Sequence, residues 1–425
     1  MTNTDTKNGA PANLIKLYGK RDDALGYELR DFLKRSVVEF EWHELECDDD
    51  CARELGMKEL ENIRLPVVEL IDGERLFSPT MKELASRLGL MANPSLREYD
   101  VSIYGAGPAG LSAAVYAASE GLRTVLIERG AVGGQAGTTS MIENYLGFPK
   151  GIAGADLAER ARLQALKFGV EILMMREGVK AEFREGKIWV DLADGGSMVA
   201  RSNICATGVD WRRLGLANED RLLHSGVYYG AGASEAPLCK GENVYIVGGG
   251  NSAGQAVMHL ADHAKKVTML VRDDALATSM SSYLIDRIKE APNVEVLYNS
   301  EVTELEGDET LGRLKIRKGE ESESWADTSR LFVAIGGVPH TEWAKDTDIV
   351  RDRAGYLVTG PDLLKDGAMP PEWQQDRSPH FLETSVAGSF AAGDVRHRSV
   401  KRVATAVGEG AMAVTFVHQY LEETA

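Results

Sequence analysis

Two short glycine clusters are the parts of this sequence whose residue types and spacing could do defined chemistry. The first fits the pattern GxGxxG with Gly105, Gly107 and Gly110, and it stands between an apolar strand pattern and a helix pattern that includes Ala109. In such a turn the first glycine permits a tight bend, the second lets the backbone approach a pyrophosphate, and the third lets helix and strand pack closely. Free N–H groups at the start of the helix then face the phosphates. The cluster therefore predicts a dinucleotide-binding site.

An acidic residue after the next strand pattern supports this interpretation. Glu128 stands about 20 positions beyond the cluster, where a carboxylate accepts hydrogen bonds from ribose hydroxyls. Arg129 follows it and is predicted to lie in the same site. The alternative is a glycine-rich turn with a purely structural role.

The second cluster fits the relaxed pattern GxGxxA with Gly248, Gly250 and Ala253, again between a strand pattern and a helix pattern. Asn251 and Ser252 lie inside the cluster, at the predicted start of the helix, and are expected to contact the nucleotide. The sequence therefore predicts two dinucleotide-binding units, each built as strand, helix and strand.

Composition limits the possible classes of protein. The 425-residue chain carries a formal net charge of −17, which argues against nucleic acid and anionic membranes as partners. No apolar run reaches the roughly 18 residues that a membrane-spanning helix needs. Four cysteines indicate a reducing compartment, and the polar start of the chain does not resemble a secretory signal. We expect a cytoplasmic protein of two to four domains.

The elements ahead of the first glycine cluster form a separate unit. Residues 13–90 show the pattern β-α-β-α-β-β-α, with Pro66 opening the third strand. Residues 1–12 are predicted to be a disordered tail, and residues 91–98 a polar linker.

The motifs along residues 99–425 together resemble those of low-molecular-weight thioredoxin reductases. Short strings occur in that family's order, and the resemblance places them around FAD: Gly134, Gln135 and Asn144 in a flavin-contacting loop, Ala206, Thr207 and Gly208 at a strand end, Gly393 and Asp394 near the ribityl chain, and Arg402, Val403 and Ala404 beside the flavin. The family has glutamine where this chain has Val403. The implied fold is α/β, with two Rossmann-like domains in which an NAD(P)H-binding domain (215–328) splits the FAD-binding domain (99–214 and 329–425).

The resemblance also bears on the choice of nicotinamide nucleotide. Members of the family that use NADPH carry a His-Arg-Arg run at the end of the second strand of this unit, where the present chain has Val271, Arg272 and Asp273. The single Arg272 favours NADPH as the second cofactor. Asp273 would repel a 2′-phosphate, so NADH and a degenerate site stay open as alternatives.

The dithiol of the family is missing from this chain. The family has Cys-Ala-Thr-Cys-Asp where residues 231–235 read Ala-Gly-Ala-Ser-Glu, so Ala231 and Ser234 replace the two sulfur positions. Glu235 stands at the place of the family's general acid, and we predict it as a catalytic residue, the alternative being a carboxylate at the hinge surface. The sequence leaves open whether Cys47, Cys51, Cys205 or Cys239 has a redox role, and it predicts no metal site.

Residues 13–90 resemble a glutaredoxin or thioredoxin-fold domain, in which a cis proline faces a redox dithiol. The stretch that corresponds to the dithiol is residues 23–26, Asp-Ala-Leu-Gly, so both sulfurs are missing here as well. We expect this domain to dock a partner or the reductase-like body.

These observations predict an FAD-dependent NAD(P)H oxidoreductase with a non-dithiol electron acceptor. The acceptor could be a ferredoxin-like protein, a quinone, another small molecule or dioxygen, and the resemblance implies a homodimer. One alternative is a non-catalytic redox sensor or interaction scaffold that responds to the state of its flavin. Another is a thioredoxin-disulfide reductase that uses other cysteines.

Overall fold

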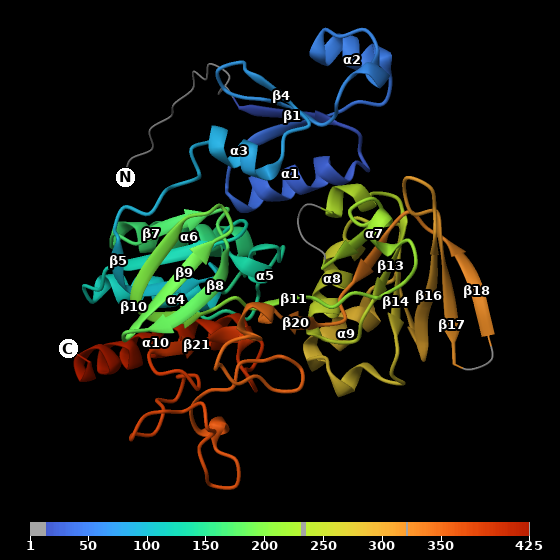
Figure 1. The fold of residues 1–425 in the computed structure, drawn as a ribbon. Helices are drawn as coiled ribbons and strands as arrows, with labels where there is room; N and C mark the ends of the chain where they lie inside the picture. The colour runs from blue at the N-terminus through green and yellow to red at the C-terminus, as the bar shows by residue number, and fades with distance from the viewer. Residues whose placement is uncertain (1–13, 231–234, 320–321, 425) are drawn as a thin grey trace, which may run out of the picture.

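A computed structural model describes residues 14–230, 235–319 and 322–424. The predicted tail at residues 1–12 lies outside the described residues. Figure 1 shows an N-terminal unit (14–90) that lies across two larger α/β units. We refer to residues 98–211 and 337–424 as the first α/β unit and to residues 212–336 as the second.

The N-terminal unit has the predicted order of elements. Its sheet has the strand order β2-β1-β3-β4, with β1 parallel to β2 and antiparallel to β3. The Leu65–Pro66 peptide is cis, as the resemblance implies. Asp23 caps the first helix through Gly26 N, at 2.6 Å. The elements are β1 (Ile15–Gly19), α1 (Ala24–Arg35), β2 (Phe40–Glu44), α2 (Asp48–Leu55), β3 (Val67–Glu69), β4 (Arg75–Phe77) and α3 (Met81–Arg87).

The first α/β unit is built around a mixed sheet. Strands β7-β6-β5-β10 run parallel, β21 extends the parallel pairing on β10, and β9 and β8 continue antiparallel. Its elements are β5 (Glu98–Tyr104), α4 (Pro108–Ser119), β6 (Thr124–Glu128), α5 (Gly134–Gly137), α6 (Gly154–Lys167), β7 (Glu171–Met174), β8 (Gly178–Arg184), β9 (Lys187–Leu192), β10 (Ser197–Cys205), β21 (Ser389–Ala391) and α10 (Val403–Glu423).

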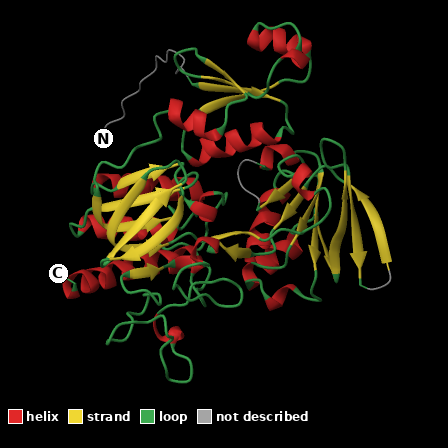
Figure 2. Ribbon diagram, in the orientation of Figure 1, coloured by secondary structure: helices red, strands yellow, loops and turns green. Residues whose placement is uncertain are grey.

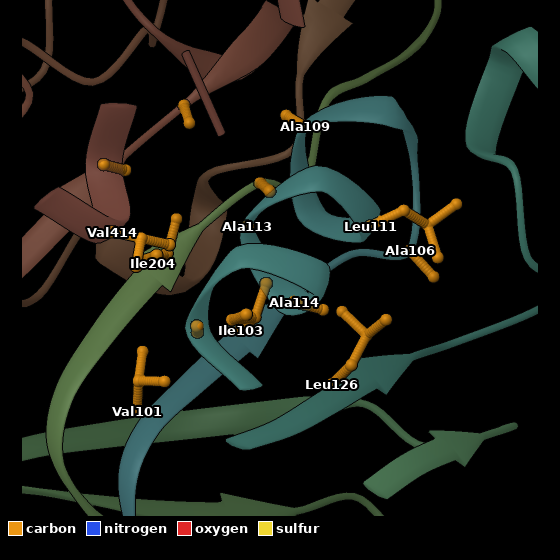
Figure 3. Packing of buried hydrophobic residues seen from close by; sticks show 14 of the residues in the cluster. Val101, Ile103, Ala106, Ala109, Leu111, Ala113, Ala114, Leu126, Ile204 and Val414 are labelled. Carbon is orange, nitrogen blue, oxygen red and sulfur yellow. The ribbon is translucent and has the colours of Figure 1, made fainter. Parts of the chain in front are cut away.

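Small residues on helix α4 set the packing of this unit. Ala113, Ala114 and Ala117 are fully buried, and they let α4 lie close to Ile103 and Leu126 of the sheet (Figure 3). On the other side, a Cβ at Gly410 of α10 would meet the carbonyl oxygen of Ala109 at 2.1 Å. The close contact between α4 and α10 therefore requires glycine, and it fixes the amino-terminal ends of both helices.

The second α/β unit has a five-stranded parallel sheet in the order β12-β19-β13-β14-β15 and a three-stranded antiparallel sheet, β16-β17-β18. Figure 2 shows both sheets and the helices beside them. The elements are α7 (Glu219–Leu222), β12 (Val227–Tyr229), β13 (Asn243–Val247), α8 (Asn251–Ala261), β14 (Lys266–Val271), α9 (Ser282–Glu290), β15 (Val294–Tyr298), β16 (Ser300–Glu306), β17 (Arg313–Lys318), β18 (Ser322–Asp327) and β19 (Leu331–Val333).

The structure moves one predicted domain boundary. The sequence placed the return to the first unit at residues 328/329, but β19 pairs with β12 and β13 inside the second unit. Leu331, Phe332 and Val333 are all fully buried, as expected of a strand covered on both faces of a parallel sheet. The two units are instead joined by the short ladder of β11 (Val209–Trp211) and β20 (Gly337–Pro339).

The described residues also form short 3₁₀ helices at η1 (Leu60–Asn62), η2 (Ala236–Cys239), η3 (Leu276–Thr278), η4 (Glu342–Ala344), η5 (Gly360–Leu363) and η6 (Gly393–Val395). Among the helices of the described ranges, none is both long and apolar enough to cross a membrane.

Candidate functional site

A cavity of about 560 Å³ gathers most of the predicted cofactor-binding residues of the first α/β unit. It opens where the carboxyl ends of β5 and β10 meet the amino-terminal ends of α4 and α10. The predicted residues that line it are Gly105, Gly107, Ala109, Glu128, Arg129, Gly134, Gln135, Asn144, Ala206, Thr207, Gly208, Gly393, Asp394, Arg402 and Val403. Gly110 and Ala404 do not line it.

The first glycine turn is shaped by close backbone contacts. Gly105 has φ of +98°, and a Cβ there would lie 2.4 Å from the carbonyl oxygen of Ala206. A Cβ at Gly110 would lie 1.8 Å from the carbonyl oxygen of Gly105. Gly110 therefore shapes the turn without lining the cavity, because its lack of a side chain lets α4 begin directly against the turn. Helix α4 has no side-chain cap, which leaves its first N–H groups available to a phosphate.

Glu128 holds this turn from the next strand. Its carboxylate oxygens accept hydrogen bonds from the backbone N–H groups of Ala106, at 2.7 Å, and Gly130, at 2.8 Å. These bonds place the carboxylate at the cavity wall, where the sequence predicts the ribose contact. Arg129 turns aside and pairs with Asp210, and its Nη1 lies 3.3 Å from Nε2 of His340.

The loop after β21 is ordered by a buried ion pair. Glu409 of α10 accepts from Gly393 N at 2.7 Å and from Arg396 Nη2 at 2.6 Å. This pair fixes the turn that carries Asp394 into the cavity. Burial raises the pKa of the Asp394 carboxyl, and the charge of nearby Lys401 lowers it in part. A partly buried carboxylate with raised pKa is suited to accept a hydrogen bond from a ligand hydroxyl.

The start of α10 also reaches the cavity. Arg402 is the N-cap residue, no side chain caps the helix, and Val403 and Ala406 line the wall. Ala404 is exposed and points elsewhere. The positive end of the helix dipole is thus directed at the cavity, as the resemblance implies for the flavin.

Three lining residues carry buried polar atoms without a hydrogen-bond partner in the structure. They are Arg35 Nε, Arg176 Nε and Asn203 Oδ1. Buried donors and acceptors of this kind are rare without a partner, because leaving them unsatisfied costs about 1–3 kcal/mol each. Together with the glycine turn and the uncapped helix ends, they fit a large polar ligand with a pyrophosphate, as FAD is.

The second glycine turn repeats the first in part. A Cβ at Gly248 would lie 2.4 Å from the carbonyl oxygen of Ala334, as Gly105 does with Ala206. Asn251 and Ser252, at the start of α8, line the same cavity as the first cluster. Gly248, Gly250 and Ala253 stand behind this end of the helix and do not line the cavity. Arg272 is exposed at the end of β14, also outside the cavity.

Glu235 lies in a different place from the one expected of a catalytic acid at the flavin. It is buried, it is not among the cavity-lining residues, and its carboxylate accepts a hydrogen bond from Tyr27 of the N-terminal unit. The pKa of Tyr27 is raised well above its usual range by burial and by the charge of Glu235. The catalytic role of Glu235 stays a prediction, while its observed contact is between units. Ala231 and Ser234 lie outside the described residues.

The cavity contains residues that sequence reasoning missed. Arg35 comes from the N-terminal unit, and His340 and Trp343 come from the chain just after β20. Burial and the neighbouring Arg129 lower the pKa of His340, so it is neutral over most of the physiological range. No local motif marks Arg35, because it reaches the cavity only through the docking of a separate unit.

The cysteines of the described chain are free thiols. Burial raises the pKa of Cys205 and of Cys239 to about 12, and burial also raises that of Cys51. Such thiols are poor nucleophiles at neutral pH. Cys47 is exposed. Within the described ranges, no group of three or more His, Cys, Asp or Glu side chains could hold a metal ion.

Comparisons with known proteins agree with this geometry. Residues 99–410 match the family model described as pyridine nucleotide-disulphide oxidoreductase. The chain belongs to this family. It is 34% identical to a thioredoxin reductase of Peptoclostridium acidaminophilum over 331 residues, and this aligned region covers 76% of this chain and 97% of that protein. It is 36% identical to a thioredoxin reductase of Bacillus subtilis over 330 residues, and this aligned region covers 76% of this chain and 95% of that protein.

Solved structures of the family have the same fold. Thioredoxin reductase from T. acidophilum superposes with a TM-score of 0.68 at 29% identity, covering 78% of this chain and all of that one. Lactococcus lactis thioredoxin reductase in its FR conformation superposes with a TM-score of 0.67 at 27% identity, covering 76% and 99%.

Family membership settles the general chemistry. This pyridine nucleotide-disulphide oxidoreductase is an FAD-dependent NAD(P)H oxidoreductase of the thioredoxin reductase-like type, with the α/β Rossmann-like fold predicted from its two glycine turns. The family uses FAD and NADPH, and the residues around the cavity fit them.

Proposed function

We propose that this oxidoreductase takes electrons from NADPH and passes them to an acceptor that is not a dithiol. Residues 231–235, where the family carries its own dithiol, contain no cysteine in this chain. When bound, FAD accepts a hydride from the nicotinamide and can release electrons singly or in pairs. The chain's own residues bind and orient: Glu128, Asp394 and the starts of α4 and α10 would hold FAD, while Asn251, Ser252 and Arg272 would hold NADPH. The acceptor is a ferredoxin-like protein, a quinone, another small molecule or dioxygen.

One observation carries the proposal. The segment that follows residues 231–234 is covered by helix α1 of the N-terminal unit and the turn before it, through the bonds of Tyr27 to Glu235 and of Arg21 Nη2 to Leu238 O at 2.9 Å. A protein substrate that exchanges disulfides would need access here. Ala231 and Ser234 cannot form a disulfide, and the high pKa of buried Cys239 makes it a poor substitute.

The N-terminal unit is proposed to be a thioredoxin-fold domain that has lost its dithiol and is used for docking. Its strand order and its order of elements support this interpretation. The residues on either side of the missing dithiol position, Asp22 and Tyr27, bond to Arg330 and Glu235 of the second α/β unit. We further propose a cytoplasmic homodimer, with no nucleic acid or membrane as partner.

The first test is an anaerobic titration of the purified holoenzyme with NADPH and separately with NADH, following the visible absorbance of the flavin. We expect rapid bleaching by NADPH. No bleaching by either nucleotide, with dithionite still reducing the flavin, would instead favour a redox sensor or scaffold.

The second test separates the acceptors. Steady-state turnover is measured with a quinone, a ferredoxin, dioxygen and oxidised thioredoxin, in the parent protein and in a Cys47→Ser/Cys51→Ala/Cys239→Ala variant. We expect turnover with a non-thiol acceptor that the variant retains. Reduction of thioredoxin by the parent, lost in the variant, would contradict the proposal and establish a disulfide reductase that uses other cysteines.

A further inference from the structure

Helix α1 of the N-terminal unit contacts both α/β units at once. Its 12 residues extend over about 18 Å at the usual rise of an α-helix, and Figure 1 shows the helix lying across the junction of the two units. The residues of the turn just before the helix and the residue at its carboxyl-terminal end bond to different units, so the helix connects two bodies that are otherwise joined by hinge strands.

The amino-terminal end is bound to the second α/β unit. Asp22 pairs with Arg330, with Oδ1 and Nη2 2.7 Å apart, and the Arg330 side chain is only 2% exposed. The carbonyl oxygen of Asp22 accepts a hydrogen bond from Ser225 Oγ at 2.9 Å. The neighbouring Arg21 donates to Leu238 O. Because Arg330 is buried, its charge depends on Asp22 for compensation.

The first turn of the helix enters the apolar core of the second unit. Tyr27 is buried, with its ring 4.6 Å from His224 and 5.3 Å from Tyr228, and its hydroxyl donates to Glu235. Tyr228 in turn stacks on Phe332 of β19. The second unit therefore includes a side chain of the N-terminal unit in its own core.

The carboxyl-terminal end is bound to the first α/β unit. Arg35 Nη2 donates to Ala131 O at 3.0 Å and to Gly134 O at 3.4 Å, in the loop of the flavin cavity. Ala131 packs in the apolar core of the N-terminal unit. The chain after α3 is fixed to the first unit too, since Ser95 Oγ donates to Glu171 at 3.0 Å.

The direct connection between the two α/β units is slight by comparison. It includes the two chain crossings that follow β11 and precede β20, strands that pair with each other inside the first unit, and an exposed ion pair between Arg287 and Glu143 at 3.0 Å. Two units joined in this way are expected to move relative to each other unless a larger interface holds them. In the structure, Asn251 and Ser252 at the start of α8 face the same cavity as the flavin-site residues.

We propose that α1 holds the second α/β unit in the arrangement in which the start of α8 faces the flavin cavity. Asp22, Tyr27 and Arg35 are positioning residues for electron transfer from NADPH. The N-terminal unit is then an internal clamp, a role that does not depend on which acceptor the enzyme uses.

The test compares a release variant with a matched control in the full-length holoenzyme. The release variant is Asp22→Asn/Tyr27→Phe, which leaves the cavity-lining Arg35 in place, and the control is Asp362→Asn/Tyr99→Phe. The control makes the same substitutions where the partners lie within the same unit: Arg398 for Asp362 and Glu171 for Tyr99. Asp22 and Asp362 have similarly exposed side chains, 30% and 29%.

The first measurement is the distance between the two α/β units. Spin labels are attached at Ser119→Cys and Ser324→Cys, both exposed positions, in a Cys47→Ser background. We expect one narrow distance distribution in the parent and in the control, and a broadened or second population in the release variant. A distribution in the release variant as narrow as the parent's would overturn the proposal.

The second measurement separates positioning from simple damage. If the competent arrangement falls to about one tenth of the population, the apparent affinity for NADPH falls about tenfold. The KM for NADPH should therefore rise about tenfold in the release variant, with FAD content and the rate at saturating NADPH unchanged. An unchanged KM would contradict the clamp.

A milder variant tests the proposal even if the release variant does not fold. Tyr27→Phe alone keeps the buried ring and removes only the hydroxyl that bonds Glu235. It should shift both the distance distribution and the KM in the same direction by a smaller amount. No shift in either quantity would count against the proposal.

Discussion

The two glycine turns of this protein share one geometry but lie in different surroundings. At Gly105 and at Gly248 a Cβ would meet a carbonyl oxygen of the neighbouring strand's end at 2.4 Å. The first turn is held by hydrogen bonds to the Glu128 carboxylate, and Gly110 at the start of α4 packs directly against the carbonyl group of Gly105. The second is followed by exposed Arg272 and has Ala253 in the place of Gly110. From this contrast we predict that the first site holds a cofactor that stays bound and the second a nucleotide that exchanges.

The largest contrast is expected at the third position of the two motifs. Gly110→Ala would place a Cβ 1.8 Å from Gly105 O and open the FAD turn, which should cost about 3 kcal/mol of unfolding free energy as overpacking does. We expect most FAD to be lost, as measured by the ratio of flavin to protein absorbance and by urea unfolding.

The matched exchange in the second turn is Ala253→Gly. It should cost about 1 kcal/mol, the usual price of glycine within a helix, and leave FAD content unchanged. If the two substitutions lowered the FAD content and the unfolding free energy equally, the two turns would be equally constrained, and the proposed difference between them would be wrong.

The next effect concerns the carboxylate that only the first turn possesses. Glu128→Gln leaves a single acceptor for the N–H groups of Ala106 and Gly130. Losing a bond to a charged acceptor costs about 1.5–3 kcal/mol, so the Kd of the apoprotein for FAD should rise roughly tenfold or more. Glu295→Gln, at an exposed pair with Lys266 outside the cavity, is the control and should change neither Kd nor stability. An unaltered Kd in Glu128→Gln would assign the residue a minor role.

Arg272 is predicted to act on one nucleotide only. Without its charge-assisted bond to the 2′-phosphate, the KM for NADPH should rise about tenfold in Arg272→Ala, while the KM for NADH stays the same. Arg313→Ala, which removes another exposed arginine of the second unit, serves as the control for general loss of charge. A parallel rise for both nucleotides would mean that Arg272 does not select the phosphate.

The smallest effect is a pH dependence within the first unit. Asp100 accepts hydrogen bonds from Arg123, at 2.7 Å from Nη2, and these bonds hold the pKa of its carboxyl below the ordinary value of 3.8. A lowered folded-state pKa means that the carboxylate stabilises the fold above pH 3.8 and loses this contribution as the pH falls through the lowered value.

Urea unfolding of Asp100→Asn and of the parent tests this sign. The difference between their midpoints should be constant from pH 8 to about 5 and shrink below about 3.8. A difference that grows toward acid pH would contradict the assignment.

Much of the flavin site could be predicted because it is made of local motifs. Gly105 and Glu128 stand at the ends of strands whose patterns are visible in the sequence, and parallel strands bring such ends to one edge of a sheet. Thr207 and Asp394 were placed in the site by the family resemblance of their short motifs. The structure places all four on one cavity wall. The order of elements in the N-terminal unit followed from its alternating patterns in the same way.

The contacts between units could not be predicted. Arg35 reaches the flavin loop, and Tyr27 reaches Glu235, across more than 90 and 200 residues of sequence. Neither residue belongs to a motif, and on α1 each resembles an ordinary member of an amphipathic helix. The apolar run at residues 331–333 was likewise assigned to the first unit, because a buried strand fits either sheet until its neighbours are known.

The sequence alone indicated two α/β units that bind dinucleotides, because each glycine cluster stands between a strand pattern and a helix pattern. It also determined that no disulfide can form between positions 231 and 234. Only the tertiary structure decided where the N-terminal unit lies and that α1 bridges the two α/β units. The reason is that a turn is specified by neighbours along the chain, whereas docking depends on the shape and charge of surfaces that exist only after each unit has folded.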